Sequence, residues 1–254
     1  MSLNSTKKPY QGTTKKISIE PNFAEAHYNR GNALAELNQL EESLNSYNRA
    51  ISINPQYAEA LNSRGKILVE LKRFNDALDS YNRAISTRPN YPSAHWNLSL
   101  CQLLTGSYEA GWPEYEWRWK DEAIRSVAGI RHFLEPIWLG TESLNGKTIL
   151  LYAEQGLGDT IQFARYASIV AKLGAKVLLE VQPQLARLLR GLEGVHQVII
   201  QGEKLPKFDY QCPLMSFVNQ TKYLKWYNVE TNWQNGFGNR LNWRKLKNKV
   251  RSSV

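Results

Sequence analysis

A short glycine-rich run that carries one carboxylate is the strongest candidate for chemistry in this 254-residue chain. It reads QGLGD and follows the apolar run KTILLYAE, so it supplies Gln155, Gly156, Gly158 and Asp159. Glycines let a ligand approach the backbone, and an aspartate can take a proton from a hydroxyl as a general base. We therefore predict Asp159 as a catalytic residue and Gln155, Gly156 and Gly158 as substrate-binding residues.

Asp159 also has a structural interpretation. As the N-cap of a helix it would accept backbone N–H bonds, and Gln162, three residues on, would supply the other half of a capping box. Such bonds hold the pKa of a carboxyl low and weaken it as a base. The sequence leaves both roles of Asp159 open.

No cofactor or metal is expected at this loop or elsewhere. Ile161 stands where a dinucleotide-binding loop has its third glycine, and the Asp159 carboxylate takes the helix end that a pyrophosphate would use. The histidines and cysteines are scattered, with no spacing typical of a metal site; they are His27, His95, His132, His196, Cys101 and Cys212. The distant cysteines favour a reducing, cytoplasmic location.

The elements that must position the QGLGD run alternate between strand and helix. Short apolar runs predict strands at KTILLYAE, AKVLLEV, HQVII and FDYQC, and helices are predicted at DTIQFARYASIVAKLG and QPQLARLLRGL. Alternation of this kind is typical of a doubly wound, Rossmann-like α/β domain with a parallel sheet. Ligands of such sheets bind at the carboxyl ends of the strands, which is where QGLGD lies.

The runs KTILLYAEQGLGDTIQFARY, LLEVQPQLARLL and FDYQCPLMS resemble the N-terminal half of a two-domain, heptosyltransferase-like (GT-B) glycosyltransferase. The resemblance implies that Gly158 and Asp159 face an acceptor, with the aspartate as the base. Transferases of this kind bind a nucleotide-sugar donor in a second Rossmann-like domain, which the 36 residues after Val218 do not resemble. The half domain is therefore expected to be inactive. The alternative is a transferase acting on a protein or glycan, with its donor half supplied by another chain.

A 34-residue repeat fills the first half of the chain. Pro21, Pro55 and Pro89 mark its units, and the first two units are identical at 17 of 34 positions. Each unit predicts two amphipathic helices joined by a polar turn, near residues 38–39 and 72–73. The pattern resembles the tetratricopeptide repeat (TPR), which implies an α-helical solenoid over residues 21–123 and a surface that binds a protein or peptide.

The third repeat departs from the first two and runs into an aromatic cluster. Ser99 replaces the glycine of the earlier units, and Gly111 stands where a small helical alanine is usual. The cluster comprises Tyr108, Trp112, Tyr115, Trp117 and Trp119. We predict that it packs as a seam between the repeats and the second domain. Bacterial chains that join such repeats to a transferase-like domain through an EYEWRWK-like bridge form a recognisable family.

The first helix of each repeat is expected to line a peptide groove. Its candidate residues are Tyr28, Asn29, Asn62, Trp96 and Asn97. Asparagine suits a peptide backbone because its amide both donates and accepts hydrogen bonds. Asn29 and Asn97 also match the position of an asparagine ladder in the repeats of O-linked N-acetylglucosamine transferases, while Ser63 interrupts it. The alternative is that these residues are solvated helix positions with no ligand.

The net charge of +9 comes mostly from the last 36 residues. Residues 219–254 carry eight basic side chains and one acidic one, together with three tryptophans. Binding of single-stranded nucleic acid by this tail is an unfavoured alternative, and a frameshift would give the same abrupt change in composition. No apolar run is long enough to cross a membrane, so no membrane partner is expected.

The predicted organisation has five parts. Residues 1–20 are a partial repeat or a disordered N-terminus, 21–123 are repeats, 124–146 are a linker, 147–218 are the Rossmann-like half domain, and 219–254 are a disordered basic tail. The combined prediction is a peptide-binding scaffold that carries an incomplete glycosyltransferase-like domain.

Overall fold

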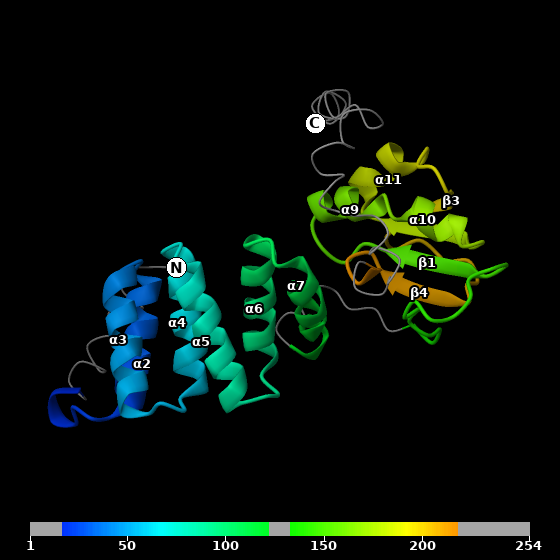
Figure 1. Cartoon of the computed structure of the whole chain (residues 1–254). Coiled ribbons are helices and arrows are strands. Elements are labelled where there is room, and N and C mark those ends of the chain that lie inside the picture. The colour runs from blue at the N-terminus through cyan, green and yellow to red at the C-terminus, as the bar shows by residue number, and fades with distance from the viewer. Residues whose placement is uncertain (1–16, 122–132, 218–254) are drawn as a thin grey trace. The chain divides into compact units, whose positions relative to one another are not determined.

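A computed structural model describes residues 17–121 and 133–217 of the chain. These residues belong to two compact units, one within residues 1–130 and the other within residues 131–254. The first unit is helical and the second contains a parallel sheet (Figure 1). Within the described ranges, no helix has the length and apolar character needed to cross a membrane. The basic tail of residues 219–254 lies outside the described residues.

Within the described residues, the helical unit contains a short helical stretch at residues 17–19, three successive helix pairs and a short 3₁₀ helix. The pairs are α2 (Ala24–Glu36) with α3 (Leu40–Ile53), α4 (Ala58–Glu70) with α5 (Phe74–Thr87), and α6 (Pro92–Leu104) with α7 (Tyr108–Tyr115), and η1 (Glu116–Lys120) follows. Each helix packs against its partner, and α3 and α5 also pack against the next pair. The predicted helix pairs of the repeats are thus confirmed.

The turn inside each pair reverses the chain through one left-handed residue. Asn38 and Lys72 have φ of 58° and 59°, and Gly106 has φ of 84°. The three positions are 34 residues apart, so the repeat preserves a backbone conformation even where the side chain changes. Glycine adopts this conformation without steric cost, whereas lysine does not.

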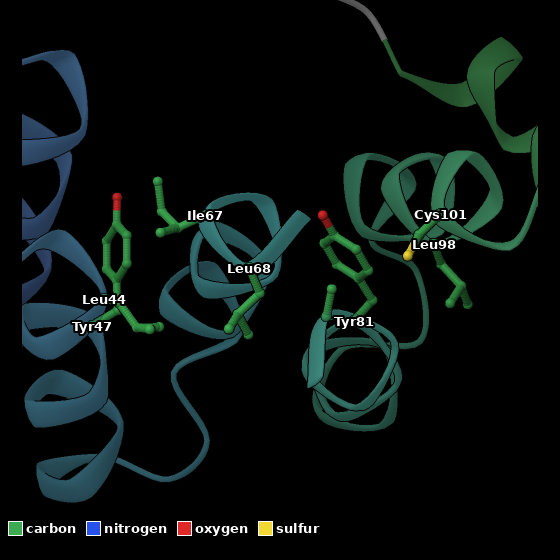
Figure 2. Close-up of a cluster of buried hydrophobic side chains, with 8 residues drawn as sticks. Leu44, Tyr47, Ile67, Leu68, Tyr81, Leu98 and Cys101 are labelled. Atoms are coloured by element: carbon green, nitrogen blue, oxygen red, sulfur yellow. The ribbon is translucent and has the colours of Figure 1, made fainter. Parts of the chain in front are cut away.

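Large rings fill the space within and between the repeats. Tyr47 and Tyr81 are both buried, in a cluster with leucines and Cys101 (Figure 2). Gly31 and Gly65 lie against these rings: a Cβ added to Gly65 would stand 2.4 Å from Cε1 of Tyr81. The glycines in the middle of α2 and α4 are therefore required by close packing.

The sheet of the second unit has four parallel strands in the order β3-β2-β1-β4. The elements in chain order are β1 (Thr148–Tyr152), α9 (Leu157–Ala164), α10 (Ala167–Lys172), β2 (Lys176–Val181), α11 (Pro183–Leu189), β3 (Val195–Ile200) and β4 (Tyr210–Pro213). In the register, Thr148 pairs with Lys176 of β2 and Ile149 with Tyr210 of β4. All four strands lie within or next to the runs that the sequence predicted.

The predicted single helix after β1 is two helices. It divides into α9 and α10 at Arg165–Tyr166, and Gly174 closes the segment with φ of 87°.

Alternate strand residues face opposite sides of the sheet. On one side Leu150, Leu178 and Ile199 are buried against the side chains of Phe133, Leu205 and Phe208.

Part of the segment predicted as a linker joins the sheet unit. The N–H of Trp138 donates to the carbonyl of Gln211 (2.9 Å), and the N–H of Gln211 donates to the carbonyl of Pro136 (3.1 Å). The Trp138 side chain is buried and stacks on Phe217, with ring centroids 5.6 Å apart. Residues 136–138 thus extend the sheet beside β4.

Candidate functional site

The glycine-rich run lies at the carboxyl end of β1, as predicted, but Asp159 is not an N-cap. Helix α9 begins at Leu157 with Gly156 as its N-cap, and no side chain caps it. Asp159 is the third helical residue, and its Oδ2 lies 3.4 Å from where a Cβ of residue 156 would stand. The capping interpretation placed the start of the helix three residues too late, because Leu157 and Gly158 were taken for loop and Asp159 for the N-cap.

The loops after β1 and β4 are tied to each other. β1 lies between β2 and β4 in the sheet. The chain continues from β1 to β2 and β3 on one side, and β4 lies on the other side, so the strand order reverses at β1. The N–H of Met215 donates to Oε1 of Glu154 (3.3 Å), and the N–H of Leu214 donates to the carbonyl of Tyr152 (3.0 Å). Ligands of open parallel sheets bind where the strand order reverses in this way.

Two glutamines that the sequence analysis did not select hold the backbone of the β1 loop. Nε2 of Gln182 donates to the carbonyl of Gln155 (2.7 Å), and Nε2 of Gln201 donates to the carbonyl of Ala153 (3.0 Å). Each glutamine directly follows the last residue of a strand, β2 or β3. That placement was a usable signal, because residues after parallel strands converge on one edge.

A second candidate site is the exposed side of the first helices, α2, α4 and α6, which we call the first-helix surface. Its exposed residues include Glu25, Asn29, Glu36, Lys66, Glu70, Leu100 and Leu104. Because equivalent positions recur every 34 residues, they form rows that cross the three helices. One row is Asn32, Lys66 and Leu100, and the next is Glu36, Glu70 and Leu104.

Of the asparagines predicted for the groove, two bind each other. Nδ2 of Asn97 donates to Oδ1 of Asn62 (3.0 Å), and Nδ2 of Asn62 lies 3.4 Å from the hydroxyl of Tyr91. Asn62 is buried, whereas Asn29 is exposed. The asparagine contact therefore connects α4 to α6 through residues that occupy different positions of the repeat. Ser63, which is the equivalent of Asn97 in the second repeat, is not part of this contact.

The predicted aromatic groove residues are half-buried in ring contacts. The ring centroids of Tyr28 and Tyr57 are 5.1 Å apart, and those of Trp96 and Tyr115 are 4.7 Å apart. Burial raises the pKa of Tyr57 to about 12, with like-charge effects from Tyr28, Glu25 and Glu59 adding to it. Both predicted residues present only part of the ring to solvent.

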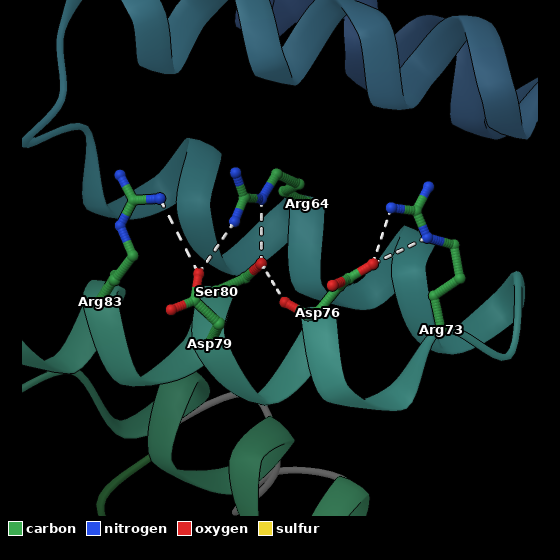
Figure 3. Close-up of polar contacts among 6 residues, drawn as sticks. All are labelled: Arg64, Arg73, Asp76, Asp79, Ser80 and Arg83. Atoms are coloured by element: carbon green, nitrogen blue, oxygen red, sulfur yellow. Dashed lines mark hydrogen bonds and ion pairs between the residues drawn. The ribbon is translucent and has the colours of Figure 1, made fainter.

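Charged residues on the other side of α4 are used within the repeat. Arg64 Nε donates to Oγ of Ser80 (2.9 Å), the Ser80 hydroxyl donates to the carbonyl of Asp76 (2.7 Å), and Arg64 also pairs with Asp79 (3.4 Å) (Figure 3). Burial lowers the pKa of Arg64. This arginine therefore joins α4 to α5 and is not part of the first-helix surface.

The aromatic cluster after the third repeat packs on α6. Trp117 stacks on His95 with ring centroids 3.7 Å apart, and Arg118 lies over the rings of Tyr115 (4.5 Å) and Trp119 (4.2 Å). Nη1 of Arg118 also donates to Oε1 of Glu116 (2.8 Å). α7, the second helix of the last repeat, and η1 thus pack on α6, which agrees with the half of the predicted seam that concerns the repeats.

No group of three potential metal ligands occurs in the part of the chain that the structure describes. Cys101 and Cys212 are both buried, and they form no disulfide with each other. The cysteine thiol of Cys101 has a raised pKa because of burial, so it is a poor nucleophile.

A sequence profile of the TPR repeat matches residues 31–71 and 65–106. These residues are TPR repeats. The TPR match covers α2 from Gly31, all of α3, α4 and α5, and α6, so it confirms the repeats predicted from the 34-residue spacing. No curated protein matches the chain significantly.

Three solved TPR-type structures illustrate the similarity. MamA is 20% identical, over 46% of this chain and 69% of its own, with a TM-score of 0.42. YrrB, described as a TPR protein with an unusual peptide-binding site, is 21% identical, over 44% and 60%, with a TM-score of 0.40. The first TPR of Spaghetti (RPAP3), bound to the HSP90 peptide SRMEEVD, is 21% identical, over 41% and 82%, with a TM-score of 0.40. None of the three is described as a glycosyltransferase.

Proposed function

We propose that the TPR unit is a scaffold that binds a peptide or an extended protein segment on the first-helix surface. The observation that carries the proposal is that some polar side chains of α4 hold neighbouring helices together, while others are exposed to solvent. Arg64 joins α4 to α5, and Asn62 joins it to α6, whereas Lys66 and Glu70 point into solvent. Stacked helical repeats present such side chains over a long surface.

The predicted groove residues divide between two roles in this proposal. Asn29 is free to bind a peptide backbone because its side chain is exposed, and Tyr28 and Trp96 offer partly exposed ring faces. Asn62 and Asn97 instead fix the spacing of α4 and α6, since each already has a side-chain partner.

Selection from a phage-displayed library of random dodecapeptides against the full-length chain tests the proposal. We expect enriched peptides whose affinity falls about tenfold or more in a Glu36→Lys/Glu70→Lys variant. The control is Glu41→Lys/Glu42→Lys, which makes the same change of charge on α3. Absence of enriched peptides, or equal loss of affinity in both variants, would overturn the proposal.

A second candidate function concerns the sheet unit. We propose that it is a Rossmann-like half domain of the GT-B kind within residues 147–218, in which Asp159 is the base for an acceptor hydroxyl. Gln155, Gly156 and Gly158 would contact the acceptor. The supporting observation is the reversal of strand order at β1, with Asp159 partly exposed at its carboxyl end. A nucleotide-sugar partner, a cytoplasmic location and a bacterial origin belong to this proposal.

Calorimetric titration of the full-length chain with UDP-, GDP- and ADP-sugars tests the second candidate. If the sheet unit supplies only the acceptor half of a transferase, the full-length chain should bind none of these nucleotide sugars. Transfer should then appear only when a second chain that binds the donor is added. Asp159→Asn should then abolish transfer and leave the melting temperature unchanged, because Asp159 makes no capping bond. Transfer that persists in Asp159→Asn would exclude Asp159 as the base.

A further inference from the structure

The first-helix surface changes character between its second and third helices. α2 and α4 carry seven charged side chains in all, and α6 carries none. Leu100 and Leu104 of α6 are 42% and 64% exposed, although they occupy the positions of Lys66 and Glu70 one repeat earlier. The part of the first-helix surface on α6 is therefore apolar, and it borders a charged part on α2 and α4.

The carboxylates next to the apolar part of the surface are available to a ligand. Glu36 and Glu70 are exposed, and neither forms an ion pair with another residue of the described ranges. Glu59, by contrast, is paired with Arg88. Lys66 is the one cation of the two rows defined above, and it lies in the row next to that of the carboxylates.

We infer that the first-helix surface selects an extended peptide that carries basic side chains at one end and apolar side chains at the other. This inference rests on the proposed peptide-binding function and names the chemistry of the ligand. The basic side chains lie against Glu36 and Glu70, and the apolar ones lie against Leu100 and Leu104. Charge complementarity sets the direction and register of the peptide, and burial of the leucines adds affinity.

The spacing of the helices sets the spacing of the ligand. Packed helices lie about 10 Å apart, and an extended chain rises about 3.3 Å per residue. A peptide that crosses α2, α4 and α6 therefore presents one contact side chain about every three residues. Its two basic residues are about three positions apart, and its apolar pair follows about three positions later.

Fluorescence polarisation with the full-length chain and fluorescein-labelled dodecapeptides tests this inference. The probes are GKSGKSGLLGSG and its reversed sequence, an acidic analogue, GESGESGLLGSG, and a polar analogue, GKSGKSGSSGSG. We expect one orientation of the basic–apolar probe to bind at least about tenfold more tightly than either analogue. Because the carboxylates are exposed, added salt should weaken this binding.

Two variants exchange residues between repeats and so keep side chains that these positions accept. Leu100→Lys/Leu104→Glu gives α6 the residues of α4, and Glu36→Leu/Glu70→Leu gives α2 and α4 a residue of α6. Each should lower the affinity for the basic–apolar probe about tenfold, with unchanged helicity, and Glu41→Lys/Glu42→Lys is the control.

The results separate this inference from the function on which it rests. Equal binding of the basic–apolar, acidic and polar probes, or undiminished binding by both exchange variants, overturns the ligand chemistry. If library peptides bind nevertheless, peptide binding stands and only the proposed chemistry fails. If no library peptide binds, both proposals fail.

Discussion

At the scale of single residues, the absence of one methyl group decides how closely the helices of a repeat approach. Gly65 faces the ring of Tyr81 so closely that a Cβ would overlap Cε1, Cδ1 and Cζ. Alanine would gain about 1 kcal/mol of helix propensity at this position, yet the overlap is expected to cost more. The ring belongs to the core, so it has little room to move.

We expect Gly65→Ala to lower the free energy of unfolding by about 1–2 kcal/mol, measured by urea denaturation. In a Tyr81→Leu background the ring is gone, and the same substitution should be neutral or stabilising. The double-mutant cycle isolates the contact from the effect of helix propensity. Additive effects would show that the ring is not the reason for the glycine.

At the scale of elements, α7 and η1 end the repeat array with a buried cation. The side chain of Arg118 is 1% exposed, lies over two aromatic rings and pairs with Glu116 at 2.8 Å. That of Arg73 in the second repeat is 51% exposed and pairs with Asp76 at 2.7 Å. Removing one partner of a buried ion pair costs far more than removing one partner of an exposed pair.

We expect Arg118→Ala to destabilise the helical unit by about 3 kcal/mol, and the control Arg73→Ala by less than about 1 kcal/mol. The change should be local. Hydrogen exchange measured by mass spectrometry should accelerate in α6, which η1 contacts, before it does in α2. A loss confined to α2, or equal losses in the two variants, would contradict this role of Arg118.

Elements with a strong period could be predicted from the sequence, and those set by tertiary contacts could not. The 34-residue spacing located the helix pairs, and apolar runs located the strands. β1, β2 and β4 are almost wholly buried, whereas β3 exposes His196 and Gln197 and was located by its apolar end, residues 198–200. Residues 136–138 have no such run, and only their bonds to Gln211 make them part of the sheet. The start of α9 was misplaced because Gly156, which has no capping side chain, is its N-cap.

The candidate sites were predictable in part for the same reason. Repeat spacing identified the first-helix positions, but it could not show that Asn62 turns toward Asn97 rather than toward a ligand. The exposed leucines were overlooked because Leu100 and Leu104 resemble ordinary core residues in a helical pattern. Only their exposure in the structure distinguishes them.

At the scale of the whole molecule, buried tyrosines make the stability of both units sensitive to alkaline pH. Burial raises the pKa of Tyr47 to about 12 and raises the pKa of Tyr81 and Tyr91 as well, all in the helical unit. In the sheet unit, burial raises the pKa of Tyr166. The folded helical unit thus keeps protons that its unfolded chain loses near pH 10.

Stability from these tyrosines is complete below about pH 10 and is lost as the pH rises toward about 12. For Tyr47, which is 2% exposed, the loss is about 3 kcal/mol. We expect urea denaturation followed by circular dichroism to show this decline. Tyr47→Phe should reduce the decline, and Tyr108→Phe, at an exposed position, should not. An equal decline in both variants would rule out Tyr47 as a source.

The central place of β1 in the sheet also has a consequence during synthesis. β1 pairs with β2 soon after both are made, but its other edge waits for β4, which begins at Tyr210. At about 5–20 residues per second, the ribosome leaves that edge open for about 3–12 s. The strand is apolar, and an open apolar edge can pair with another chain. Ribosome-arrested chains in which β1 but not β4 has left the ribosome should therefore pellet more readily than shorter or longer ones.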